Sequence, residues 1–306
     1  MADQAASLLG LLFNPFYLFE VSRQLVGEFV VATRALREPR PGQFAWVRLA
    51  LPFVGRWTVG RGGVTQASSH SWALRAQRFA YDFLIVDDGT RGRTKRRREL
   101  ADHPSWGQPL QAPITGEVVK VVDHWADHPA GARFRLPLTT RELAGNHLVI
   151  RQSVPPAFVL IAHLQCGSCI HRVGDTVLRG DFIGRCGNSG MSTEPHVHLQ
   201  AQDRADLFAS RSLPLAFERI VVERNGGRRH VRVGVLLGGD ADETDLAAIP
   251  MPATTDELPV LREPQPALGW LTALLQLLGL AVGMTTLYAL LFMLMSALLS
   301  TSSWRI

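Results

Sequence analysis

The chain contains few cysteines for its length. Cysteine occupies three of the 306 positions, namely Cys166, Cys169 and Cys186. An odd count leaves at least one thiol unpaired even in an oxidising compartment, and a structural zinc site of four cysteines would lack its last ligand. We therefore expect these residues to lie in the core or in turns, with at most one disulfide among them.

Charged residues are also scarce, at 19% of the chain. The 32 Lys and Arg residues exceed the 27 Asp and Glu residues, which gives a net charge of +5. This positive charge suits an anionic partner such as a cell wall or a lipid head-group surface. Basic and aromatic residues do not interleave, which argues against nucleic acid as a partner. The strongest basic cluster, residues 91–98, is expected to be a solvated loop rather than a binding contact.

Residues 267–299 contain no charged residue at all. A bilayer core about 30 Å thick is crossed by about 20 apolar residues in a helix, so this stretch is long enough to span a membrane once. No proline divides it, which favours one transmembrane helix over a hairpin. Gly279 and Gly283 form a G-x-x-x-G pair that would let a second helix approach, and an oligomer is one alternative for that pair.

Histidines form the pattern that points to chemistry. His196 and His198 flank Val197, and alternate residues of a strand project from the same face, so the two imidazoles can share one site. A catalytic zinc takes three protein ligands from nitrogen, sulfur or carboxylate groups and leaves the fourth position to water. His70 and Asp82, upstream in the chain, can complete such a set with His198.

Several motifs recur around these residues in a fixed order. They are Gln77–Phe83 with Asp82 inside it, Ala112–Gly116, Gly145–Ile150, Ala162–Leu164, Val173–Asp175, Gly187–Gly190 and Pro195–Leu199. Over about residues 46–218 this ordered set resembles the lysostaphin-like zinc metallopeptidases, a family that includes the beta-lytic and LytM-type enzymes, which cut peptidoglycan peptides.

The resemblance implies a role for each of five residues. His70, Asp82 and His198 match the ligands of one zinc ion (Zn2+), whereas His163 and His196 match the two catalytic histidines that do not bind the metal. One departure concerns His70, which lies twelve residues before Asp82, whereas four is the commonest spacing in the family. The other histidines are interpreted as structural: His103, His124, His128, His147, His171 and His230.

The implied fold is mainly β, with an antiparallel β-sheet and a folded, barrel-like β sandwich. The β-branched run at 118–122 and the segments 148–150 and 158–161 predict strands of this fold. We place the catalytic domain at residues 41–225, an extension and linker at 226–266, and the transmembrane helix at 267–299.

Residues 1–40 predict an N-terminal amphipathic helical segment, because apolar residues alternate there with charges such as Glu20 and Glu28. Such a helix could lie on the membrane or pack on the catalytic domain. The segment has neither a basic start nor an obvious small-residue cleavage site, so a cleaved secretory signal is not expected.

The expected function is therefore that of a membrane-anchored zinc metalloendopeptidase that hydrolyses peptide bonds of peptidoglycan. Arg305 follows the apolar stretch, which favours a cell-membrane location with the catalytic domain on the outer, cell-envelope side. Two alternatives remain open: a catalytically silent module that binds the wall or activates other hydrolases, and an endopeptidase that acts on a protein. The five-residue set is complete, which favours an active enzyme.

Overall fold

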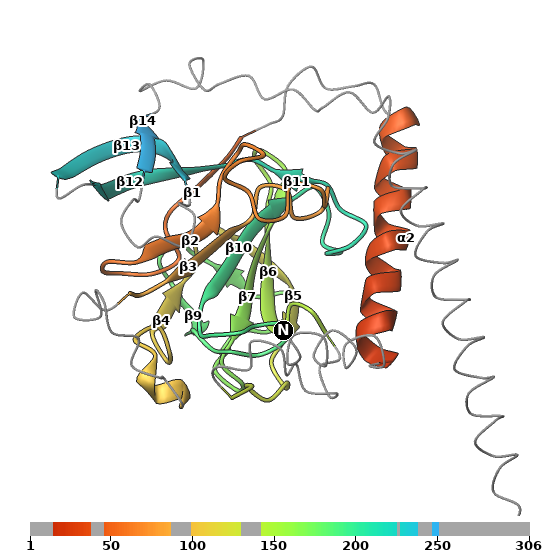
Figure 1. Cartoon of the computed structure of the whole chain (residues 1–306), viewed down its shortest axis with the longest axis horizontal. Coiled ribbons are helices and arrows are strands. Elements are labelled where there is room, and N and C mark those ends of the chain that lie inside the picture. The colour runs from red at the N-terminus through yellow and green to blue at the C-terminus, as the bar shows by residue number, and fades with distance from the viewer. Residues whose placement is uncertain are drawn as a thin grey trace, which may run out of the picture. The chain divides into compact units, whose positions relative to one another are not determined.

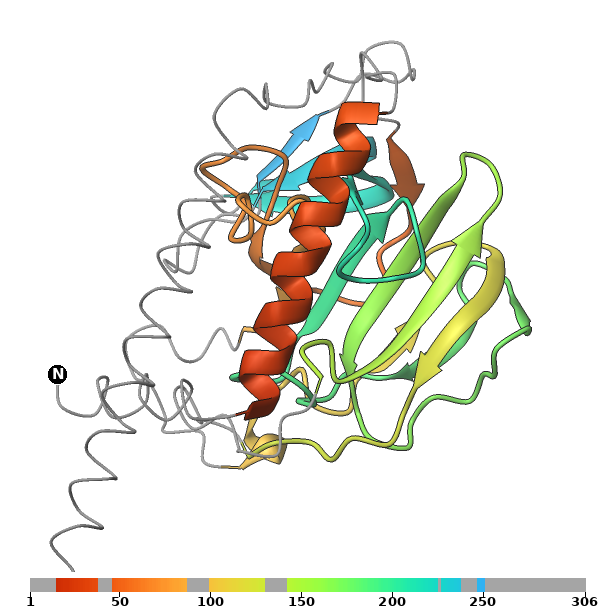
Figure 2. The ribbon, with the colours of Figure 1, turned by 90° about the vertical axis from the view of Figure 1, so that its right-hand side faces the viewer.

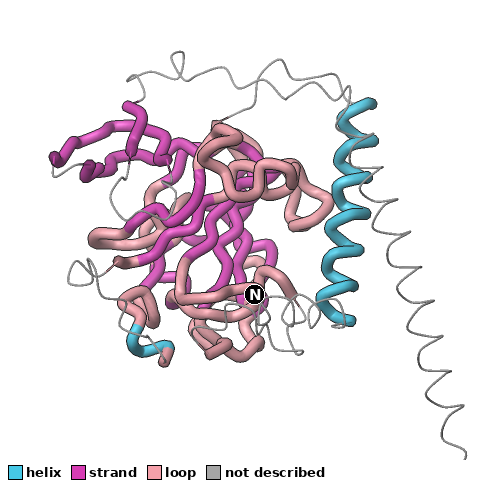
Figure 3. Tube along the Cα trace, in the orientation of Figure 1, coloured by secondary structure: helices cyan, strands magenta, loops and turns pink. Residues whose placement is uncertain are grey.

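The fold is mainly β and antiparallel, as the sequence predicts. It is seen in a computed structural model, which describes residues 15–37, 46–86, 99–129, 142–224, 227–237 and 247–250. Strands and loops dominate the described ranges, beside helix α2 (Pro15–Arg37) and the short 3-10 helix η2 (Leu100–Asp102) (Figures 1 and 3).

The largest sheet carries the strands in the order β2-β3-β10-β7-β6-β5-β8, with β11 added beside β10, and every pair in it is antiparallel. Its strands are β2 (Thr58–Gly62), β3 (Tyr81–Leu84), β5 (Gly116–Val122), β6 (Asn146–Gln152), β7 (Ala157–Leu164), β8 (Thr176–Val177), β10 (Val197–Gln202) and β11 (Ser212–Leu213). The three runs predicted as strands lie in β5, β6 and β7. Strand β10, which carries His198 and directly follows His196, lies between β3 and β7 (Figure 1).

Two smaller sheets complete the described fold. One has the order β1-β12-β13-β14 and the other pairs β4 with β9. Their strands are β1 (Val47–Leu49), β12 (Leu215–Arg224), β13 (Gly227–Leu237), β14 (Ala247–Pro250), β4 (Pro109–Gln111) and β9 (Phe182–Arg185). The pairing of β1 with β12 is parallel. The hydroxyl of Tyr81 donates to the carbonyl oxygen of Leu236 at 2.7 Å, which ties β13 to β3.

Strand β10 separates two environments, because its side chains alternate between the faces of the sheet. Val197, Leu199 and Ala201 are fully buried in the apolar core with residues of β3, β6 and β7. Burying a side chain of leucine size stabilises the fold by about 1.5–3 kcal/mol. Polar side chains occupy the other face, where His198 is followed by Gln200 at the next outward position.

One row of paired residues crosses the large sheet on this polar face. His198 lies opposite Asp82 on β3 and opposite Ala162 on β7, and Ala162 in turn pairs with His147 on β6. Directly paired residues of neighbouring strands project from the same face of the sheet. The sheet alone therefore brings Asp82 and His198 together, although 116 residues separate them in sequence.

Helix α2 packs on the β domain, which is one of the two arrangements expected for the N-terminal segment. It begins at a proline, whose fixed φ suits the first turn of a helix. The Glu28 carboxylate accepts hydrogen bonds from the backbone N–H of Arg75 at 2.6 Å and from its guanidinium at 3.1 Å. Arg34 donates to Asp203 at 2.7 Å. Figure 2 shows the helix beside the strands of the large sheet.

Several expectations lie outside the described residues. These are the transmembrane helix at 267–299 with Gly279 and Gly283, and the basic cluster at 91–98. Within the described ranges, no helix is both long and apolar enough to cross a membrane.

The cysteines occupy core and turn positions, and the disulfide considered among them is absent, because all three are free thiols. Cys186 is buried, and its backbone forms an isolated antiparallel β-bridge with Leu164, whereas Cys166 is exposed. The backbone N–H groups of Cys166 and Cys169 donate to two aspartates, Asp127 and Asp123. These bonds hold the turn in place without a cross-link.

Candidate metal centre

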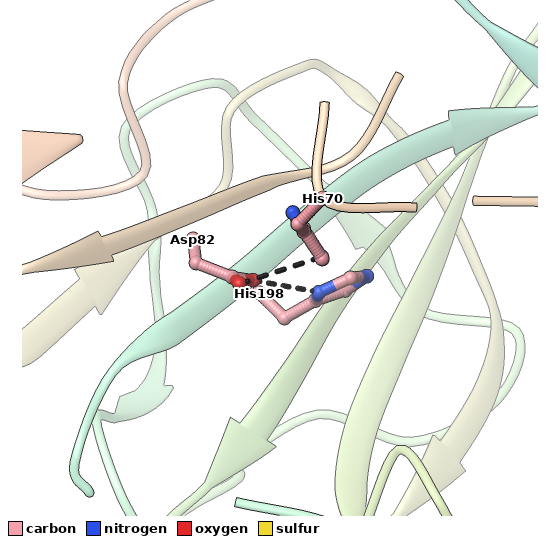
Figure 4. Close-up of side chains that lie close together, drawn as sticks. All are labelled: His70, Asp82 and His198. Atoms are coloured by element: carbon pink, nitrogen blue, oxygen red, sulfur yellow. Dashed lines mark hydrogen bonds and ion pairs between the residues drawn. The ribbon is translucent and has the colours of Figure 1, made fainter. Parts of the chain in front are cut away.

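Three separate elements bring His70, Asp82 and His198 together, and their side chains point toward one another (Figure 4). Asp82 and His198 come from paired strands, whereas His70 comes from the loop between β2 and β3. This loop folds back on itself, since the Ser69 hydroxyl donates to the carbonyl oxygen of Arg78 at 2.6 Å. The fold-back is what makes the twelve-residue spacing compatible with a shared site.

The distances among the three side chains suit a single metal ion. His198 Nδ1 lies 2.9 Å from Asp82 Oδ1, and His70 Nε2 lies 3.5 Å from Asp82 Oδ2. One ligand atom from each residue lies within 4.8 Å of the others. Zinc bonds of about 2.0–2.2 Å in a tetrahedron hold ligand atoms roughly 3.4 Å apart, so the set fits zinc with little adjustment. Imidazole and carboxylate are also ligands that zinc prefers.

The electrostatics of the cluster favour an ionised Asp82. Burial alone would raise the pKa of Asp82, but the hydrogen bond from His198 and the neighbouring His196 and His70 hold that pKa well below its usual range. For His70, burial has the opposite effect and lowers the pKa, although the negative charge of Asp82 acts to raise it. For His198, burial is outweighed by Asp82 and Gln200, and the pKa is raised. Asp82 thus keeps its negative charge where a cation would bind.

Hydrogen bonds to the backbone and the side chain of Arg75 fix the loop that carries His70. Glu28 of helix α2 binds the Arg75 backbone N–H and side chain, and Ser212 donates its backbone N–H to the Arg75 carbonyl oxygen at 2.8 Å. Gln200 donates to the carbonyl oxygen of Ala76 at 3.1 Å. Helix α2 and β10 therefore both fix the position of one ligand.

His163 lies beside the centre with one ring nitrogen already committed. Its Nδ1 lies 2.8 Å from the carbonyl oxygen of Ser189, which can only accept, so Nδ1 carries the proton and Nε2 is left as an acceptor. Burial, followed by the neighbouring His196 and His198, lowers the pKa of His163 well below its ordinary value. The ring is therefore neutral and able to take a proton at Nε2.

The backbone at His163 is in the left-handed region, with φ at 62°. Such a conformation is uncommon for a residue other than glycine and costs about 1–3 kcal/mol, and functional sites concentrate it. The acceptor Ser189 is held by a close approach of two backbones, because a Cβ on Gly145 would lie 2.4 Å from the Ser189 carbonyl carbon. The Ser189 hydroxyl also donates to the carbonyl oxygen of Leu164 at 2.7 Å.

His196 faces the same cluster from the residue before β10. Its Nδ1 donates to the carbonyl oxygen of Glu194 at 2.8 Å, and its Nε2 lies 3.8 Å from Asp82 Oδ1. The rings of His196 and His163 have centroids 4.6 Å apart. Two imidazoles therefore stand next to the candidate metal ligands, each with Nδ1 held by a main-chain carbonyl.

All five residues expected from the sequence are thus brought into one cluster. Sequence reasoning missed the groups that orient them: the side chain of Gln200 and the carbonyl oxygens of Ser189 and Glu194. Gln200 could have been found from the strand alternation, since it is the next residue after His198 on the same face. The carbonyl partners give no signal in the sequence. His171 is held elsewhere, with Nε2 donating to the carbonyl oxygen of Phe182 at 2.9 Å.

An antiparallel sheet thus carries a His, Asp, His cluster that could hold a metal ion, with two further histidines beside it. Residues 103–208 match the model of peptidase family M23, and the resemblance drawn from the motifs is confirmed over that segment. The segment contains His163, His196 and His198, whereas His70 and Asp82 precede it.

Solved structures similar to this chain include three described as peptidases. The catalytic domain of lysostaphin from Staphylococcus simulans is 17% identical over 51% of this chain and 87% of that one, with a TM-score of 0.30. The catalytic domain of the prophage-encoded M23 protein EnpA from Enterococcus faecalis is 16% identical over 54% and 93%, with a TM-score of 0.33. The deep-sea M23 metalloprotease pseudoalterin is 16% identical over 61% and 96%, with a TM-score of 0.32. No curated protein matches the chain.

Proposed function

We propose that this protein is a zinc-dependent metalloendopeptidase that hydrolyses peptide bonds of peptidoglycan. The observation that carries the proposal is the convergence of His70, Asp82 and His198 within 4.8 Å, beside two histidines outside the ligand set. The family match over residues 103–208 supports peptide hydrolysis as the reaction. A silent regulatory module would not need all five residues, and all five are present.

His70, Asp82 and His198 would hold the zinc ion. When bound, zinc supplies a Lewis acid that polarises the scissile carbonyl and lowers the pKa of its water to about 7. Asp82 is the ligand that offsets the positive charge, because it stays ionised among three histidines.

His163 and His196 would handle protons around the reacting bond. His163 presents an unprotonated Nε2, since Ser189 holds the proton on Nδ1, so this nitrogen can take a proton from the attacking water. His196, held by Glu194, places its own Nε2 toward the same cluster and can stabilise the oxyanion when protonated. A fixed Nδ1–H on each ring means that neither imidazole must reorient between the two tasks.

We further propose that residues 267–299 anchor the enzyme in the cell membrane, with the catalytic domain on the outer side. The absence of charge over this stretch and the Arg305 that follows it support the proposal. A reporter fused after Ile306 checks it: an enzyme tag active only in the cytoplasm should be active there, and a protease added to spheroplasts should remove the catalytic domain.

The decisive experiment for the activity combines the full chain with zinc and isolated peptidoglycan. Soluble fragments with new amino termini should appear, and a chelator should stop their release. His198→Ala should release none, whereas His171→Ala, a control histidine bound to Phe182, should act like the wild type. Fragment release that continues in the chelator would refute the metal-dependent mechanism, and intact peptidoglycan from every wall type would refute the substrate.

A further inference from the structure

Gln200 connects the two sides of the candidate metal centre from a fully buried position. Its side-chain oxygen lies 2.9 Å from His198 Nε2, and its side-chain nitrogen lies 3.1 Å from the carbonyl oxygen of Ala76 in the His70 loop. It is 0% exposed, so no water competes for these bonds. A buried amide in such a place would cost free energy unless both of its ends were satisfied.

The direction of these hydrogen bonds follows from the main chain. The Ala76 carbonyl can only accept, so the Gln200 NH2 group must face it, and the Gln200 oxygen must then face His198. The Gln200 NH2 group also donates to Gln202 Oε1 at 2.6 Å. Gln202 is oriented in the same way, because its own NH2 group donates to the carbonyl oxygen of Arg204 at 2.7 Å.

This direction decides which nitrogen of His198 can bind a metal. An oxygen that only accepts faces Nε2, so Nε2 donates to Gln200 and is not available to a metal. Nδ1 is left as the nitrogen that would coordinate, once a bound cation replaces the proton that it shares with Asp82. Nδ1 is also the nitrogen that lies 2.9 Å from Asp82. Metal-bound histidines commonly donate their other ring N–H to such a partner, which fixes the tautomer and the ring orientation.

We propose that Gln200 is the positioning residue of the metal centre: its amide oxygen holds the Nε2 proton of His198, which aims the Nδ1 lone pair at the metal shared with Asp82 and His70. The bond from the same amide to Ala76 sets which way the amide faces. The inference rests on the proposed zinc-dependent function but concerns metal binding, which is measured without a peptide substrate.

The test compares two variants that share one defect and differ in another. Gln200→Met and Gln200→Glu both lose the bond to Ala76, but only Gln200→Met lacks an oxygen for His198. Zinc affinity of the full chain is measured by competition with a chromophoric chelator. We expect Gln200→Met to bind zinc about 10–100-fold more weakly and Gln200→Glu to stay within about threefold of the wild type. Gln202→Met is the control, since Ala76 still orients Gln200, and it should bind like the wild type.

Equal affinities for the Met and Glu variants would overturn the proposal, because the oxygen would then be irrelevant. A measurement on the unaltered protein guards against a variant that does not fold. In the zinc-loaded wild type, nitrogen NMR of the histidine rings should show His198 bound through Nδ1 with a proton on Nε2, and coordination through Nε2 would also overturn it. Cleavage of peptidoglycan with equal variant affinities refutes only this inference. The expected zinc affinities without cleavage refute only the proposed function.

Discussion

Hydrogen bonds to main-chain carbonyls set the state of the individual histidines. His163 and His196 each give Nδ1–H to a carbonyl oxygen, of Ser189 and Glu194 respectively, so both present Nε2 to the cluster. His198 has the opposite arrangement, with Nδ1 toward Asp82. Main-chain carbonyls therefore orient His163 and His196, whereas the side chains of Asp82 and Gln200 orient His198.

Replacing His163 should separate catalysis from metal binding. We expect His163→Asn to lower kcat about 10²–10⁴-fold, the usual contribution of a general base, while zinc content stays at the wild-type level. Asparagine is chosen because it tolerates the left-handed backbone at this position, where φ is 62°. Peptidoglycan turnover and zinc content by elemental analysis check the prediction.

A parallel loss of zinc and activity in His163→Asn would contradict the assignment of His163 outside the ligand set. His163→Ala serves as a comparison for the backbone. It should be less stable than His163→Asn by about 1 kcal/mol, because alanine adopts the left-handed region less readily.

Buried His147 gives the fold a pH dependence away from the ligands. Burial, followed by the nearby Lys120, lowers the pKa of His147, so the folded state favours the neutral ring. The unfolded chain then binds more protons, and the stability contributed by the neutral ring is present above the unfolded pKa of about 6.5 and is lost as pH falls below it.

We therefore expect the free energy of unfolding to decrease between pH 7.5 and pH 5, and to decrease less in His147→Gln. Chemical denaturation of the zinc-free proteins at the two pH values measures how the free energy of unfolding changes with pH in each protein. The control is His171→Gln, at a half-buried histidine outside the strands of the large sheet. If the free energy of unfolding changed equally with pH in the wild type and in His147→Gln, His147 would not contribute to the pH dependence of stability.

At the level of elements, helix α2 acts as a support for the site rather than as a detached segment. Its Gly27 packs so closely on the loop after β10 that a Cβ there would lie 2.2 Å from the Phe208 carbonyl oxygen. Arg23 lies over the Phe208 ring at 4.5 Å. The same helix holds Arg75 in the His70 loop through Glu28. Loss of the helix contact would thus displace the loop that carries His70, one of the proposed metal ligands.

Gly27→Ala should destabilise the protein although alanine is the better helix former. The propensity gain is about 1 kcal/mol, but the clash with a backbone atom forces the helix to move, and overpacking of this kind costs about 1–3 kcal/mol. We expect a net loss of about 1 kcal/mol in denaturant unfolding. Val26→Ala, at the neighbouring position that is 63% exposed, should change stability by less than about 0.5 kcal/mol. A more stable Gly27→Ala would refute the tight packing.

The elements differ in how far the sequence predicts them. Local alternation of residue types is visible directly in a sequence. It predicts strands β5, β6 and β7, and it predicts that His196 and His198 project from the same face. The docking of helix α2 and the parallel pairing of β1 with β12 depend on contacts between distant residues, such as Arg34 with Asp203, and no local pattern encodes them. The fold-back of the His70 loop is only partly predictable, because its serines are visible in the sequence but their hydrogen-bond partners are not.

For the whole molecule, the metal should be part of the stability of the fold. The three proposed ligands come from β3, β10 and the loop before β3, so a bound ion would join segments that otherwise meet only through the sheet and a few hydrogen bonds. Binding to the folded state alone adds about 4 kcal/mol when free zinc exceeds the dissociation constant 1,000-fold. Removing zinc with a chelator should therefore lower Tm.

The matched control for this prediction is Asp82→Asn, whose Tm should no longer respond to zinc or to chelator. Tm is read by circular dichroism, with the metal-free wild type as the reference. A zinc-dependent rise in Tm that persists in Asp82→Asn would place the stabilising ion elsewhere in the chain.

The alternation along β10 also limits how related sequences can vary in length. One face of this strand is wholly apolar, and the other carries His198, Gln200 and Gln202 in succession. Inserting or deleting a single residue between Val197 and Gln202 would reverse the alternation on one side of the change, and would turn apolar side chains toward the polar face or polar side chains into the core. Homologous chains that retain the site should therefore gain or lose residues only beyond the ends of this strand, in loops such as the one at 203–211.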